Sequence, residues 1–141
     1  SGVIENIKKS EEILIKNGAK KIVYLNVSAA FHSKIMKIAE EKMKTFLLQT
    51  KFCDSIYPVI SNYCATPSQS KKTILENLSK QMSNKVKWVE SIKVLELNNE
   101  KNIIEIGPGK VLTGLIKRIS KNFNYYNINE VKDIEEFKNA I

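Results

Sequence analysis

The chain has 141 residues, of which 43% are hydrophobic and 8% aromatic, and its formal net charge is +8. This length suits one ordinary domain with a core of its own, and the hydrophobic content argues against a disordered chain. No apolar run approaches the roughly 20 residues of a membrane span, and the first residues do not have the layout of a signal peptide. We therefore expect a soluble, folded protein with no membrane partner.

The positive charge does not by itself indicate a nucleic-acid-binding protein. Almost all the basic residues are lysines, and Arg118 is the only arginine. Recognition of bases and phosphates favours arginine, because its planar guanidinium can donate two parallel hydrogen bonds. The abundance of Lys, Asn and Ile is also what an AT-rich coding sequence produces, and we predict no nucleic-acid partner.

The chain has two cysteines, Cys53 and Cys64, and one histidine, His32. Two separated cysteines are too few for a disulfide framework, although one bridge stays open, and they favour reduced thiols in a cytoplasm-like compartment. With a single histidine we predict no metal site. Cys64 is a conceivable nucleophile beside His32, but nothing around it in the sequence indicates a low thiol pKa, and an inert thiol is the preferred interpretation.

The first half of the chain alternates helical and extended patterns. Apolar residues at helical spacing predict a helix that Asn17 and Gly18 end, and a β-branched and aromatic run then predicts a strand. The predicted elements are a helix over 3–17, a strand over 21–27, a helix over 34–48, a short strand after Pro58, and a helix over 70–82 with Ser70 as its N-cap.

The second half continues the same alternation. The predicted elements are a helix over 86–97, a strand over 103–106, a helix over 110–119, a strand over 124–128 and a helix over 131–140. Strands that alternate with helices predict an α/β fold with a largely parallel sheet.

One candidate site is the loop between the predicted strand 21–27 and the helix 34–48. Such loops carry the sites of open α/β sheets, and this one contains His32, the only side chain available for imidazole acid–base chemistry. Ser28 and Ser33 flank it, but neither lies in a GxSxG nucleophile elbow, and the chain contains no such elbow. A histidine that only lines a helix start is the alternative interpretation.

A second candidate is the turn Gly107–Pro108–Gly109–Lys110 between a predicted strand and a predicted helix. Free backbone N–H groups at such a turn can hold an anion. The turn is neither a P-loop nor a GxGxxG fingerprint, so a tight structural turn is the preferred interpretation.

Four blocks of the sequence together resemble the malonyl-CoA:acyl-carrier-protein transacylases. The blocks are VSAAFHSKIM from 27, PVISNYCATP from 58, LSKQMSNKVKWVESI from 78 and IIEIGPGKVLTGLIKRI from 103. Their order and spacing match the family over essentially the whole chain. The match favours the stand-alone transacylase over the acyltransferase domains of polyketide synthases.

The resemblance implies that the chain is the C-terminal half of such an enzyme. The family's other half carries the oxyanion-hole glutamine, the GHSxG serine and the malonate-binding arginine, and none of these has a counterpart here. Residues 1–27 would end a ferredoxin-like small subdomain. Residues 28–141 would form the C-terminal part of a large α/β-hydrolase-like acyltransferase domain.

The resemblance also assigns roles to three residues. His32 would be the base that activates the serine, and a main-chain carbonyl at Gln81 would orient its imidazole; a Gln81 that only ends a helix is the alternative. Phe31 would favour malonyl over bulkier acyl groups, because its ring fills the space of an α-methyl. Ala30 replaces a common proline and loosens the loop.

The implied reaction moves a malonyl group from coenzyme A to the phosphopantetheine thiol of acyl carrier protein through a malonyl-serine. The implied partners are acyl carrier protein, malonyl-CoA as substrate, and the N-terminal half; no cofactor is expected, and the isolated chain should be inactive. Lys110, Lys117 and Arg118 would form a basic surface for CoA or the carrier, or only a solvated helix face. The implied location is a bacterial cytoplasm, or an organelle with bacterial-type fatty acid synthesis. A non-catalytic module that binds an acidic carrier is the alternative function.

Overall fold

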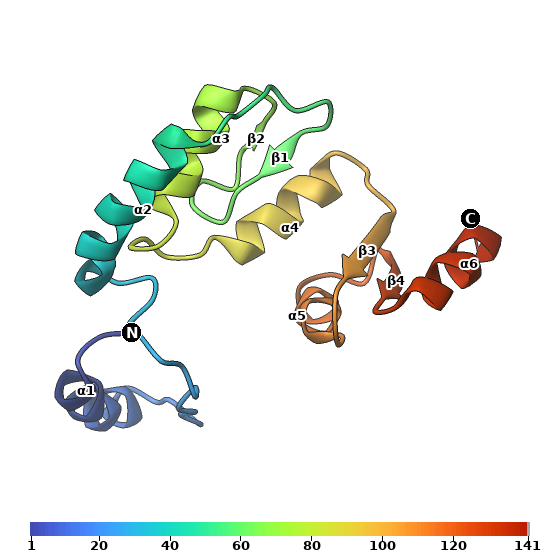
Figure 1. Ribbon diagram of the computed structural model, residues 1–141. Helices are drawn as coiled ribbons and strands as arrows, with labels where there is room; N and C mark the ends of the chain where they lie inside the picture. Colours follow the sequence, from blue (N-terminus) through green and yellow to red (C-terminus); the bar gives the residue numbers. More distant parts are fainter. Residues whose placement is uncertain (141) are drawn as a thin grey trace. The chain divides into compact units, whose positions relative to one another are not determined.

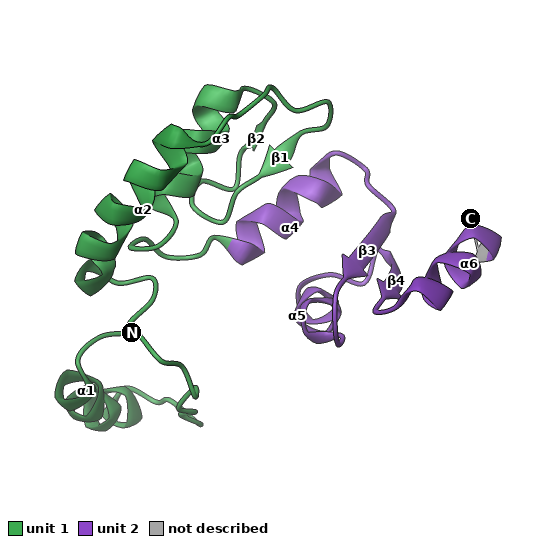
Figure 2. Ribbon diagram, viewed as in Figure 1, with its two compact units in different colours: residues 1–87 green, residues 88–141 purple. Residues whose placement is uncertain are grey.

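The structure is a computed structural model that describes residues 1–140 (Figure 1). The chain divides into two compact units, Ser1–Lys87 and Trp88–Ile141, which are coloured separately in Figure 2. The candidate site around His32 lies in the first unit, and the Gly107–Lys110 turn lies in the second.

The first unit is mainly helical. Helices α2 and α3 pack against each other, and β1 and β2 form an antiparallel pair. Its elements are α1 (Ile4–Lys16), the 3-10 turn η1 (Lys34–Met36), α2 (Lys37–Gln49), β1 (Val59–Ile60), β2 (Pro67–Ser68) and α3 (Lys71–Lys80). The helices and the strand after Pro58 confirm the sequence predictions, whereas β2 was not predicted.

Helix α1 ends where the sequence predicted, at Asn17 and Gly18. Gly18 has a φ of +89°, and its N–H donates to the carbonyl of Ile15 at 3.0 Å. The N–H of Ala19 donates to the carbonyl of Leu14, also at 3.0 Å. This pair of bonds is a Schellman motif, which favours glycine at the left-handed position.

The predicted strand over 21–27 is wrong for this structure. The segment has no secondary structure, and its apolar side chains are exposed: 63% for Val23, 76% for Leu25 and 61% for Val27. A strand needs a neighbour that shares its hydrogen bonds, and none of the described residues pairs with this segment. The β-branched residues of this segment favour an extended conformation, but among the described residues no neighbouring strand pairs with it.

Helix α3 begins after Ser70, as predicted, but Ser70 does not cap it through its side chain. The carboxylate of Asp54 does so instead: its Oδ1 accepts a hydrogen bond from the N–H of Lys71 at 2.8 Å. An aspartate from a distant loop supplies the acceptor that a helix N-terminus requires.

The second unit is built around two parallel strands, β3 and β4 (Figure 1). They pair in register from Asn102 opposite Asn124 to Ile106 opposite Ile128. The elements are α4 (Trp88–Leu97), β3 (Asn102–Ile106), α5 (Val111–Ile119), β4 (Asn124–Ile128) and α6 (Val131–Ala140). All five confirm the sequence predictions.

The core of the second unit consists of Ile92, Ile116 and Phe123, which are 2%, 3% and 6% exposed. These three residues come from α4, from α5 and from the residue before β4. Helix α6 contacts β4 through an edge-to-face pair of Tyr126 and Phe137, with ring centroids 5.1 Å apart. The burial of these apolar groups holds the parallel pair between helices.

The α/β class is therefore confirmed, with one qualification about the sheet. The parallel part consists of β3 and β4, and β1 and β2 form a separate antiparallel sheet. The boundary after Lys87 separates two compact units of the structure, and it is not a test of the subdomain boundary predicted after residue 27. That boundary stays a prediction. Among residues 1–140 no helix is long and apolar enough to cross a membrane.

Candidate active site around His32

His32 lies between η1 and the unpaired segment before it, and its backbone is in the left-handed region, with a φ of +63°. This conformation is uncommon for residues other than glycine and persists only where surrounding contacts hold it. One such contact is the bond from the N–H of His32 to the carbonyl of Met82, at 2.9 Å. The hydroxyl of Ser33 donates to the carbonyl of Ala30 at 2.7 Å and closes the loop on the other side.

The imidazole of His32 contacts the same turn as its backbone does. Its Nδ1 lies 3.2 Å from the carbonyl oxygen of Gln81 and 3.0 Å from that of Asn84. Both oxygens can only accept, so Nδ1 must carry the proton in these contacts. In a neutral ring this leaves Nε2 as the unprotonated nitrogen, which can take a proton from a substrate or a nucleophile.

A shallow pocket of about 290 Å³ adjoins His32. Apart from His32 and Gln81 its lining is apolar, and the ring of Phe31, which is 42% exposed, forms part of it. The lining residues are Phe31, His32, Met43, Leu47, Leu78, Gln81 and Met82. An apolar surface with one imidazole suits a small acyl group next to a base.

The structure thus brings together the three residues that the sequence singled out, His32, Gln81 and Phe31. It adds Asn84, whose carbonyl lies closer to Nδ1 than that of Gln81 does. Sequence reasoning missed Asn84 because a main-chain oxygen leaves no trace in residue identity. The only available signal was the position of Asn84 in the block that also contains Gln81.

Cys64 does not line the pocket that contains His32. Its Sγ lies 3.4 Å from the hydroxyl of Ser61 and 3.4 Å from the backbone nitrogen of Thr66. Burial by itself raises the pKa of the Cys64 thiol, but the hydrogen bonds of Ser61 and Thr66 and the charge of Lys87 lower it below its usual value. Both cysteines are free, and the preference for an inert thiol at Cys64 stays a prediction.

The glycine turn at 107–110 is held by the protein's own groups. Gly107 and Gly109 have φ values of +129° and +94°, and the N–H of Gly109 donates to the side-chain oxygen of Asn129 at 2.7 Å. The two carboxylate oxygens of Glu105 accept hydrogen bonds from the N–H groups of Leu112 and Thr113, at 2.9 and 2.8 Å. Glu105 thereby occupies the helix N-terminus where an anion would bind, and this supports the structural interpretation of the turn.

The three basic residues that follow this turn, Lys110, Lys117 and Arg118, are exposed. The ammonium of Lys117 lies 4.9 Å from the ring centroid of Tyr125, a cation–π contact. Their proposed contact with CoA or with a carrier protein stays a prediction. As for metals, no group of three or more potential ligands occurs among residues 1–140.

Comparison with known proteins identifies relatives over nearly the whole chain. The chain is 38% identical over 135 residues to the malonyl CoA-acyl carrier protein transacylase of Bacillus subtilis strain 168; the match covers 96% of the chain and 43% of that relative. No family model matches the chain.

Two solved structures resemble the fold closely. The structure of MCAT from Streptococcus pneumoniae aligns with a TM-score of 0.91 at 30% identity, over 99% of this chain and 46% of that one. A malonyl-transacylase in complex with its type II PKS acyl-carrier protein aligns with a TM-score of 0.88 at 31% identity, over 96% of this chain and 44% of that one.

The three relatives are all transacylases of this kind, and each matches nearly the whole chain. These matches are consistent with a chain that corresponds to the C-terminal half of the relatives. The chain spans less than half the length of the curated relative and of both structures. The chain therefore belongs to the malonyl-CoA:acyl-carrier-protein transacylase family.

Proposed function

We propose that this chain is the part of a malonyl-CoA:acyl-carrier-protein transacylase that supplies the histidine base. The observation that carries the proposal is the contact of His32 Nδ1 with two main-chain carbonyl oxygens. These contacts assign the proton to Nδ1 and leave Nε2 as the basic nitrogen, next to a pocket with an apolar lining.

In the proposed reaction, Nε2 of His32 takes the hydroxyl proton of a serine as the serine oxygen attacks the malonyl thioester carbon. The tetrahedral adduct collapses, the carbon–sulfur bond breaks, and the imidazolium returns the proton to the departing CoA sulfur. Nε2 then takes the thiol proton of the carrier's phosphopantetheine as its sulfur attacks the malonyl-serine. The proton goes back to the serine oxygen when the ester bond breaks.

The serine belongs to the segment that precedes this chain in the proposed complete enzyme. Three further roles come with the proposal: acyl carrier protein as the acceptor, malonyl-CoA as the donor, and the N-terminal half as a structural partner. One of the two related structures is a malonyl-transacylase in complex with its acyl-carrier protein, and this supports the choice of acceptor. A bacterial-type fatty acid pathway in the cytoplasm is the proposed setting.

The subdomain assignment is also part of the proposal. Residues 1–27 would complete a ferredoxin-like subdomain, and residues 28–141 would complete the larger hydrolase-like domain. The exposed apolar side chains of Val23, Leu25 and Val27 support this, because a β-branched segment without a neighbouring strand is suited to pairing with one.

The test is malonyl transfer by the complete protein that contains this chain. Incubation with malonyl-CoA and phosphopantetheinylated carrier should give a malonyl-serine on the protein and a malonylated carrier, both visible by mass spectrometry. His32→Gln should remove carrier malonylation while the protein stays folded. If the complete protein forms neither adduct, the proposed malonyl transfer activity is refuted, and a non-catalytic module that binds the carrier is favoured instead.

A further inference from the structure

Glu40 is a fully buried carboxylate close to the turn that holds His32. It lies in the first part of α2, and it is 2% exposed although its helix neighbours Lys37 and Glu41 are 59% and 57% exposed at their side chains. Burial of a carboxylate is unfavourable unless hydrogen bonds and an opposite charge compensate it. The contacts of Glu40 show where that compensation comes from.

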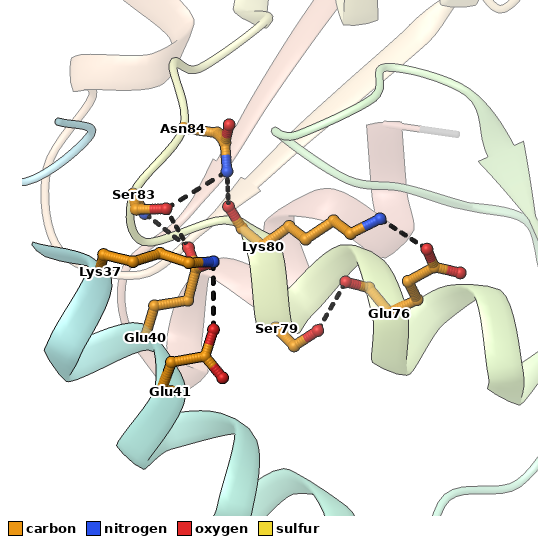
Figure 3. A network of polar contacts seen from close by, with 8 residues as sticks. All are labelled: Lys37, Glu40, Glu41, Glu76, Ser79, Lys80, Ser83 and Asn84. Atoms are coloured by element: carbon orange, nitrogen blue, oxygen red, sulfur yellow. Dashed lines mark hydrogen bonds and ion pairs between the residues drawn. The ribbon is translucent and has the colours of Figure 1, made fainter. Parts of the chain in front are cut away.

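Both oxygens of Glu40 accept from donors, as Figure 3 shows. Oε1 accepts from the ammonium of Lys37, one helical turn earlier. Oε2 accepts twice from Ser83, from its N–H at 3.0 Å and from its hydroxyl. Although burial tends to raise the pKa of Glu40, the hydrogen bonds of Lys37 and Ser83 lower it below its usual value, so the group is a carboxylate at neutral pH.

Ser83 belongs to the turn from 81 to 84, which contacts both His32 and Glu40. The carbonyls of Gln81, Met82 and Asn84 accept hydrogen bonds from His32, two of them from Nδ1 and one from its backbone N–H. Ser83, between them, contacts Glu40 instead. Every residue of the turn from 81 to 84 is therefore bonded either to His32 or to Glu40.

The turn has a second anchor in α3. The side-chain nitrogen of Asn84 donates to the carbonyl of Lys80 at 2.7 Å, which joins the turn to the end of that helix (Figure 3). Glu40 joins it to α2, the helix that follows His32. An apolar pair would connect two helices without the unfavourable burial of a charge. What the carboxylate adds is direction, because two hydrogen bonds to one serine fix the orientation of the main chain on either side of it.

We propose that Glu40 is a positioning residue for His32: it clamps Ser83 so that the carbonyls of Gln81 and Asn84 point at Nδ1. It does not touch the reacting atoms and acts only through the turn. The inference rests on the proposed function for its effect on catalysis, whereas its effect on the imidazole does not depend on that function. Misplacement of a catalytic group by about 1 Å can lower a rate by about 100-fold.

The test uses three variants of the complete protein. Glu40→Gln keeps the shape of the side chain, but its amide nitrogen is a donor that faces Lys37 or Ser83, which are donors as well. Ser83→Ala removes only the hydroxyl that donates to Glu40. Glu41→Gln is the matched control, because Glu41 also pairs with Lys37, at 3.2 Å, but is exposed and has no bond to the turn.

Two quantities are measured for each variant. One is kcat/KM for malonyl transfer to the carrier. The other is the tautomer of neutral His32, from the ¹⁵N chemical shifts of Nδ1 and Nε2 in histidine-labelled protein, with His32→Gln to assign the signals. Circular dichroism shows whether each variant is folded.

We expect the wild-type ring to be protonated at Nδ1 and the ring of Glu40→Gln to be a mixture of tautomers, with kcat/KM lower by about 10- to 100-fold. Ser83→Ala should change the tautomer ratio and kcat/KM in the same direction but by less. Glu41→Gln should keep the wild-type tautomer and a kcat/KM within about twofold of wild type. A folded Glu40→Gln protein with the wild-type tautomer and activity would overturn the proposal. If Glu40→Gln does not fold, an unchanged tautomer in Ser83→Ala overturns it equally.

The two proposals fail in different ways. A wild-type protein that transfers no malonyl group contradicts the proposed function, while the tautomer measurement still decides the role of Glu40. If the wild type is active and the His32 tautomer is unchanged in Glu40→Gln and Ser83→Ala, only the positioning role of Glu40 is contradicted.

Discussion

The Nδ1 atom of His32 lies 3.0 Å from the carbonyl oxygen of Asn84, a residue 52 positions further along the chain. That contact, together with the one to Gln81, takes the place that a carboxylate occupies in other acid–base sites. A carbonyl oxygen accepts a hydrogen bond without carrying a full charge. It therefore fixes the tautomer of the ring without placing a negative charge beside it.

The first prediction concerns His32 itself. In the complete enzyme, His32→Ala should lower kcat/KM for malonyl transfer by about 10²- to 10⁴-fold, since a general base contributes that much. The measurement is the steady-state rate of carrier malonylation, with a thermal unfolding curve to show that the variant is folded. Near-normal turnover in a folded variant would contradict the assignment of the base.

The second prediction concerns Phe31, whose ring borders the pocket beside His32. Phe31→Ala should raise the ratio of kcat/KM for methylmalonyl-CoA to that for malonyl-CoA by about 10-fold or more, because removal of the ring leaves room for the α-methyl group. Competition between the two thioesters, read from the mass of the acylated carrier, gives the ratio directly. Met43→Ala is the control, since Met43 lines the same pocket but is not next to the base in the chain. An equal change in both variants would show that pocket volume alone sets the preference.

The third prediction is that the 141-residue chain alone forms no malonyl adduct with malonyl-CoA. It contains no GxSxG elbow, so His32 has no serine of that kind to activate. Intact-mass spectrometry after incubation is the measurement, and the complete protein is the positive control. A malonyl adduct on the isolated chain would show that another nucleophile accepts the acyl group, and the site of the adduct would identify it.

The fourth prediction concerns the stability of the second unit. Hydrogen bonds from Thr113, and then from Leu112 and Asn127, hold the pKa of Glu105 below its usual value. A carboxyl group with a lowered pKa stabilises the fold at pH values above its unfolded pKa. That contribution is lost as the pH falls through the folded pKa. Glu105→Gln should therefore lower Tm at pH 7, and the difference from wild type should shrink at acidic pH.

Thermal unfolding followed by circular dichroism, at pH 7 and at a pH below the folded pKa of Glu105, checks this prediction. Glu100→Gln is the matched control, because the side chain of Glu100 is exposed and caps no helix N-terminus. The backbone N–H of Glu100 donates to the carbonyl of Leu95 in α4, and the substitution keeps that bond. A Tm difference for Glu105→Gln that does not change with pH would mean that the carboxylate charge has no part in holding the start of α5.

The residue pattern alone predicted most of the elements. Helix α1 and its end at Gly18, the strands β3 and β4, and the helices α5 and α6 follow from local periodicity and turn residues, and the structure confirms them. Such features depend on neighbours in the sequence, so a single sequence contains the necessary information. The four sequence blocks likewise indicated the family that the comparisons now show.

Other features depended on groups that are far apart in the sequence, and only the tertiary structure decided them. Residues 21–27 have the composition of a strand, but a strand forms only with a partner, and none of the described residues supplies one. Ser70 has the right position for a cap, yet Asp54 supplies the acceptor oxygen instead. The glycine turn could have held an anion, but Glu105 fills the helix start.

The same distinction applies at the candidate site. The sequence by itself determined that His32 is the only imidazole, that Phe31 precedes it, and that Gln81 stands where the family resemblance expects the orienting carbonyl. The tertiary structure alone decided that Asn84 shares this contact and that Glu40 bonds the serine between them. These contacts involve main-chain atoms and a buried charge. Their energies depend on distance and burial after folding, which residue identity does not specify.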